Sequence, residues 1–172
     1  AVGLHPNRES AEWYTVAQYR ELAQNPKVVA IGECGLDYYR AMQANTEGSA
    51  SVFVKQAKGA SSAYFRPLEV NDEVKRKQKA ILNDQIALAS ELGKPLIIHC
   101  RPSKGTQDAY HELIEILKEA KVEHSTLRGD IHFFVGGIQE AEAFFALDFT
   151  VSFTAVITFA RDYDAVIRAV PL

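Results

Sequence analysis

Two patterns of hydrophobic and polar residues alternate along the chain. Short apolar runs that contain β-branched residues are typical of buried parallel strands. They predict strands over Ala1–His5, Val28–Gly32, Leu96–His99, Asp130–Phe134 and Phe149–Phe153. Between these runs, apolar residues recur at helical spacing. This periodicity predicts helices over Ala11–Gln24, Asn71–Leu92, Gln107–Ala120, Gln139–Leu147 and Asp162–Ala169.

The alternation of strands and helices indicates an α/β fold with a parallel sheet. An open doubly wound sheet and a (β/α)8 barrel both have this pattern. No G-x-G-x-x-G or P-loop sequence follows any expected strand, and polar residues stand at several strand ends. Because barrel active sites gather at the carboxyl ends of the strands, we expect a TIM-like barrel. A closed barrel needs more strands than these, so we also expect a partial domain.

Residues 41–70 interrupt the alternation. The segment is rich in glycine and serine and encloses two short β-prone pieces, Ser51–Val54 and Ala63–Phe65. Loops of this length are uncommon unless they are functional or disordered. We therefore expect one domain over residues 1–172 with an irregular insertion at about 41–70, which forms a hairpin or a lid.

The candidate chemistry lies at the ends of three expected strands. Glu33 follows Val28–Gly32 directly, His99 ends the next apolar run, and His132 lies in Ile-His-Phe-Phe on the run after that. A carboxylate at the end of a buried strand is costly unless it meets a metal, a cation or hydrogen-bond donors. Mixed histidine and carboxylate ligands suit Zn²⁺, Mn²⁺, Fe²⁺ or Mg²⁺ better than Ca²⁺. We therefore expect Glu33, His99 and His132 to bind metal, with Glu33 able to bridge two ions.

Three further residues accompany these candidate ligands. His5 could contact a substrate phosphate, bind metal or cap the helix that follows it. Asp37 could orient a ligand or Arg101, or belong to a turn. Arg101 could hold a phosphate or pair with Asp37.

Composition limits the classes of function. The chain has 172 residues, 47% of them hydrophobic, and a formal net charge of −3. That charge argues against a protein that coats duplex nucleic acid, although an enzyme can hold a few phosphates through a metal. No apolar run is long enough to span a bilayer, so no membrane association is expected, and nothing indicates an obligate protein partner. Cys34 and Cys100 suit buried, reduced thiols and a cytoplasmic location.

Several of these segments resemble the TatD family of metal-dependent deoxyribonucleases, which are amidohydrolase-like barrels. The segment Ala30–Tyr38, AIGECGLDY, resembles the most specific signature of the family. Gly3–Pro6 resembles its G-x-H-P sequence, Ile98–Arg101 its histidine strand, and Ile131–Gly136 its H-C-F-S/T-G sequence. Val151–Thr154 resembles the segment of strand seven.

The resemblance implies that the chain contains about strands 3–7 of a TIM-like barrel and their helices. It implies divalent-metal-dependent hydrolysis of phosphodiester bonds in DNA or short nucleic-acid ends, often as a 3′ exonuclease. The ions would be Mg²⁺, Mn²⁺ or Zn²⁺, two in the intact protein. It assigns metal ligation to Glu33, His99 and His132, and a substrate-pocket role to His5. The family's H-x-H pair on the first strand and its T-D-A-P-Y aspartate on strand eight lie outside this sequence.

Two alternatives stay open at this point. Barrels of this superfamily also hydrolyse esters, lactones or amides with the same metal chemistry, so the ligands alone do not identify the substrate. A chain that lacks some strands and ligands could also be a catalytically incomplete fragment with exposed sheet edges.

Overall fold

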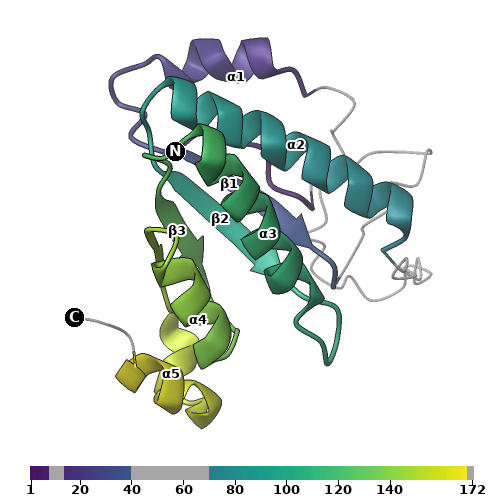
Figure 1. Ribbon diagram of the computed structural model, residues 1–172, viewed down its shortest axis with the longest axis vertical. Helices are drawn as coiled ribbons and strands as arrows, with labels where there is room; N and C mark the ends of the chain where they lie inside the picture. Colours follow the sequence, from purple (N-terminus) through teal and green to yellow (C-terminus); the bar gives the residue numbers. More distant parts are fainter. Residues whose placement is uncertain (8–13, 40–69, 170–172) are drawn as a thin grey trace, which may run out of the picture.

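The computed structural model describes residues 1–7, 14–39 and 70–169 and contains one parallel four-stranded sheet (Figure 1). The strands, in the order β1-β2-β3-β4, are Ile31–Asp37, Leu96–Arg101, Gly129–His132 and Phe149–Val151. The α-helices α1 to α5 are Val16–Ala23, Asp72–Glu91, Asp108–Glu123, Ile138–Phe145 and Asp164–Ala169. Two short 3₁₀ helices, Ala155–Thr158 and Arg161–Tyr163, precede α5. The predicted α/β fold with a parallel sheet is confirmed; within the described residues the sheet does not close into a barrel.

The described helices α2, α3 and α4 pack against the sheet, and the candidate residue His99 lies on the face opposite to them. Helix α2 packs against β1, α3 against β2 and β1, and α4 against β4. Along β2, Ile98 and Cys100 are buried in the core with residues of α2 and α3, whereas His99 between them is only partly buried. Successive side chains of a strand point to opposite faces. His99 therefore lies on the face that the helices do not cover.

The predicted boundaries are right for α2 and wrong for the first two strands. The side chain of Asn71 caps α2 by accepting a hydrogen bond from the backbone of Val74. The expected strand over residues 1–5 forms only one isolated bridge, between Val2 and Ile31. The second strand starts at Ile31 and continues to Asp37, so it does not end at Gly32.

Other predictions concern segments that the structure describes only in part. Helix α1 starts at Val16 with Thr15 as its cap, and residues 8–13, which include part of the expected helix, are not described. The expected insertion at 41–70 lies outside the described residues except for its last residue, Val70. Among the helices that are described, none has the length and hydrophobicity needed to cross a membrane.

Two buried glutamines of α2 hold the backbone segments that carry candidate site residues. The amide of Gln85 accepts a hydrogen bond from Leu4 N at 2.8 Å and donates one to Leu4 O at 3.2 Å. The amide of Gln78 does the same for Asp37, with distances of 2.9 Å from Asp37 N and 3.0 Å to Asp37 O. Each glutamine thus satisfies both backbone groups of one residue, as a neighbouring strand would.

We expect Gln85→Leu to destabilise the fold by about 2–4 kcal/mol, because it leaves the buried N–H and C=O of Leu4 without their partner. Urea unfolding would measure the change in the free energy of unfolding. Gln18→Leu is the matched control, since Gln18 lies exposed on α1. Equal stability of the two variants would contradict the proposal that Gln85 holds the backbone of Leu4, the residue before His5.

Candidate metal centre

Glu33 occupies an irregular position in the middle of β1. Gly32 pairs with Ile97 and Cys34 with Ile98 of β2, so Glu33 is an extra residue without a partner in the register. Such a bulge locally turns the strand and redirects a side chain. Both neighbours of Glu33 are buried, while its own side chain is 33% exposed. The bulge, and not the end of the strand as predicted, therefore brings this carboxylate out of the core.

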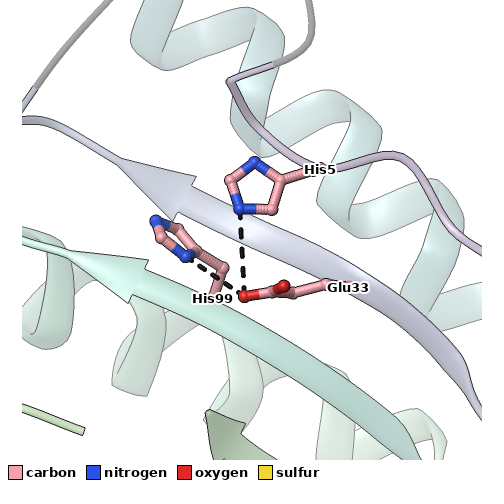
Figure 2. Close-up of side chains that lie close together, drawn as sticks. All are labelled: His5, Glu33 and His99. Atoms are coloured by element: carbon pink, nitrogen blue, oxygen red, sulfur yellow. Dashed lines mark hydrogen bonds and ion pairs between the residues drawn. The ribbon is translucent and has the colours of Figure 1, made fainter. Parts of the chain in front are cut away.

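His5, Glu33 and His99 come together on the face of the sheet opposite the described helices α2 to α4. Nδ1 of His99 lies 3.2 Å from Oε1 of Glu33, and Nε2 of His5 lies 3.8 Å from the same oxygen. Figure 2 shows the two histidine side chains converging on this carboxylate, Glu33 and His99 from neighbouring strands and His5 from a separate segment. One ligand atom from each residue lies within 4.8 Å of those from the other two. Two imidazoles and a carboxylate form a donor set that suits a divalent ion, so these residues could hold a metal.

Asp37 supports His99 from the other side of the imidazole ring. Oδ2 of Asp37 lies 2.9 Å from Nε2 of His99, and the Asp37 side chain is fully buried. The same oxygen accepts a hydrogen bond from the Asn7 side chain at 2.6 Å, and Oδ1 accepts one from Tyr39 N at 3.0 Å. A carboxylate on one ring nitrogen fixes the orientation of a histidine that binds metal with the other. This is the ligand-orienting position considered for Asp37, and it leaves Nδ1 of His99 facing Glu33.

The two carboxylates shift the protonation of the cluster. The hydrogen bond from His99 lowers the pKa of Glu33, an effect stronger than the opposing effect of burial. Burial alone would lower the pKa of His99, but its hydrogen bonds and charge interactions with Asp37 and Glu33 outweigh this and raise it. Without metal, the arrangement therefore favours a proton on His99 between two anions. A metal that binds Nδ1 has to displace this proton, so binding releases protons and weakens at acid pH.

The hydrogen bonds of His5 favour the role of a donor. Its Nδ1 accepts a hydrogen bond from Asn7 N at 3.1 Å, so in the neutral ring the proton sits on Nε2. Nε2 is the nitrogen that faces Glu33. Ligation of a metal through Nε2 would require loss of the bond from Asn7, whereas donation to an anion keeps it.

His132 and Arg101 lie near the cluster but outside the group of three. His132 pairs in register with His99 on the neighbouring strand, yet its exposed ring contacts Ser152, with Nδ1 3.3 Å from Oγ. Its charge nevertheless contributes to lowering the pKa of Glu33. Arg101 is exposed and stacks its guanidinium 4.0 Å from the centre of the Tyr39 ring.

Some residues that shape the site were not identified from the sequence. Asn7 contacts both His5 and Asp37, and only its position two residues after His5 could have indicated this. The two cysteines are buried and free, as predicted. Burial raises the pKa of Cys34 to about 12, which keeps the thiol protonated beside the cluster.

Comparisons with known proteins agree on one family. The family model described as TatD related DNase matches residues 1–172. The 3′-5′ ssDNA/RNA exonuclease TatD of Erwinia amylovora is 31% identical over 99% of this chain and 51% of its own length. An uncharacterised metal-dependent hydrolase of Bacillus subtilis, YabD, is 30% identical over 99% of this chain and 53% of its own length.

A solved structure has a similar fold. The crystal structure of YjjV, a TatD homologue from Escherichia coli K12, matches with a TM-score of 0.67 and 24% identity, over 99% of this chain and 53% of that one. The chain thus spans about half the length of the proteins it matches. The family model nevertheless matches this sequence over residues 1–172, so the chain belongs to the family of TatD-related DNases.

Proposed function

We propose that this chain carries part of the active centre of a divalent-metal-dependent hydrolase that removes nucleotides from the 3′ ends of DNA. The observation that carries the proposal is the convergence of His5, Glu33 and His99, with Asp37 buried behind His99. A buried carboxylate behind a histidine that faces a second carboxylate is typical of a metal centre. The named activity of the Erwinia relative supports a nucleic-acid substrate.

Glu33, His99 and His132 are the proposed ligands. When bound, one or two ions of Mg²⁺, Mn²⁺ or Zn²⁺ supply Lewis-acid activation of a phosphate and of water. Glu33 offers the negative charge and His99 the neutral nitrogen, which Asp37 orients. His132 lies on the next strand in register with His99 and is exposed enough to be reached from the same face.

His5 and Arg101 are the proposed contacts to the substrate. The Nε2–H of His5 faces Glu33, so it can donate to a phosphate oxygen that binds beside that carboxylate. Arg101 lies at the end of β2, two residues after His99 and on the same face of the strand. The Arg101 guanidinium can contact a phosphate of the nucleic acid whose other phosphate oxygen His5 holds, while it stays stacked on Tyr39.

The test is digestion of single-stranded DNA that carries a label at its 5′ end, with Mg²⁺, Mn²⁺ or Zn²⁺ added. The 172-residue chain and the complete product of its gene should be assayed side by side. We expect progressively shorter labelled products from the complete protein. His5→Leu should slow their formation at least about 10-fold, because leucine has no donor and the hydrogen bond to a charged phosphate is lost.

His111→Leu is the control, since His111 is an exposed histidine of α3 that faces Glu140. It should digest DNA at the unmodified rate. A panel of esters, lactones and amides completes the experiment. If any of these compounds is hydrolysed while DNA is not cleaved, the nuclease proposal is replaced by the alternative, a hydrolase of esters, lactones or amides.

A further inference from the structure

A chain of hydrogen bonds connects β3 and β4 and ends on His132. Oγ of Ser152 donates to Oδ2 of Asp130 at 2.6 Å, and the same Oγ lies 3.3 Å from Nδ1 of His132. The other carboxylate oxygen of Asp130 accepts a hydrogen bond from Oγ1 of Thr150 at 2.8 Å. Asp130 is therefore held by two hydroxyl groups of the neighbouring segment. Within the described residues, Ser152 is the hydrogen-bond partner of the histidine side chain.

The protons in this chain can be assigned from the number of donors. A serine hydroxyl has one hydrogen, and an ionised carboxylate only accepts. Because Ser152 gives its hydrogen to Asp130, its oxygen can only accept from His132. Nδ1 of His132 must then carry the ring proton, and in the neutral imidazole Nε2 keeps its lone pair.

This assignment matters because of the position of His132. It pairs with His99 in the parallel register between β2 and β3, one strand away from the ring that contacts Glu33. A histidine binds metal through the nitrogen that has the lone pair, and a hydrogen bond at the other nitrogen decides which one that is. The three residues thus form an arrangement that prepares one nitrogen of His132 for a ligand.

We propose that Ser152, held by Asp130, is a positioning residue that fixes His132 in the Nδ1–H form and so presents Nε2 as a metal ligand. The first half, the tautomer, depends only on the hydrogen bonds. The second half rests on the proposed metal ligation by His132. The arrangement assigns a role to Asp130 of β3 and to Ser152 after β4, two residues that the sequence did not identify.

The tautomer can be measured without metal or substrate. A long-range ¹H–¹⁵N correlation spectrum at pH 8, above the usual titration range of histidine, distinguishes protonated from unprotonated ring nitrogens. We expect Nδ1–H in the unmodified protein and a shift toward Nε2–H in Ser152→Ala. Ser152→Thr should restore Nδ1–H because it keeps the hydroxyl. Thr150→Val is the matched control, since it removes a hydroxyl from the same carboxylate without touching His132.

Calorimetric titration with Zn²⁺ tests the consequence for the ligand. We expect Ser152→Ala to weaken Zn²⁺ binding about 10-fold and Thr150→Val to leave it within about 2-fold. An Nε2–H ring in the unmodified protein, or an unchanged tautomer in Ser152→Ala, overturns the positioning role whatever the titration shows. Unchanged Zn²⁺ affinity in both His132→Ala and Ser152→Ala overturns the ligand role. Failure of DNA digestion alone would affect only the proposed substrate.

Discussion

Glu33→Gln should abolish most of the metal affinity of this protein while leaving its fold intact. The amide keeps the shape of the side chain and removes the negative charge of Glu33, which faces both His5 and His99. Loss of a residue that merely supports a ligand weakens metal binding by about 10- to 100-fold, so loss of a charged ligand should cost at least about 100-fold. Titration with Zn²⁺ or Mn²⁺ measures this, and digestion of DNA should fall at least as much.

The control for this variant is Glu91→Gln. Glu91 is a carboxylate at the end of α2 whose bond to Arg20 lies on the outer surface. The Glu33 side chain is partly exposed, and the bulge is defined by the pairing of its neighbours Gly32 and Cys34 with β2. The free energy of unfolding, measured in urea, should therefore change by less than about 1 kcal/mol in the Glu33 variant. Unchanged metal affinity in a folded Glu33→Gln protein would contradict the assignment of this cluster as a metal centre.

Local chemistry made part of this structure predictable. Helix α2 has a capping side chain at Asn71, a long amphipathic stripe and a glycine at position 93, and all three signals depend on neighbours along the chain. The same is true of His99, which a short apolar run placed on a strand. For such elements the residues nearby in sequence supply most of the determining interactions.

The geometry around Glu33 depends on interactions between distant segments. Apolar residues before Gly32 suggested that the strand ended there, yet Cys34 and Leu36 pair with β2 and are buried as well. The bulge arises because Gly32 and Cys34 pair with consecutive residues of β2 and skip Glu33. Only the register of two strands separated by α2 shows this. The contact of Asp37 with His99 joins residues 62 positions apart and has the same origin.

Gly35→Ala should be among the most destabilising single substitutions in this chain. The backbone of Gly35 has a φ of +137°, a conformation that side chains disfavour, and it lies against β2. A Cβ at this position would come within 1.9 Å of the carbonyl oxygen of His99 and 2.9 Å of its carbonyl carbon. Because those atoms are backbone in the middle of a sheet, the strands have to separate. We expect a loss of more than about 4 kcal/mol in the free energy of unfolding, measured by urea denaturation.

Gly105→Ala is the control for a glycine with positive φ and no close contact. Gly105 also has a positive φ, +77°, but a Cβ there meets nothing within 4 Å. The free energy of unfolding of Gly105→Ala should fall only by the cost of placing a residue with a Cβ in a left-handed backbone conformation, about 1–2 kcal/mol. The excess loss of stability in Gly35→Ala then combines the less favourable φ of +137° with the cost of moving β1, which carries Glu33, away from β2, which carries His99. Any folded Gly35→Ala protein should therefore also bind Zn²⁺ more weakly, since its 3.2 Å contact between Glu33 and His99 cannot persist. Equal stability of the two alanine variants would show that β1 can shift without disturbing the sheet, and that the bulge does not hold the carboxylate in place.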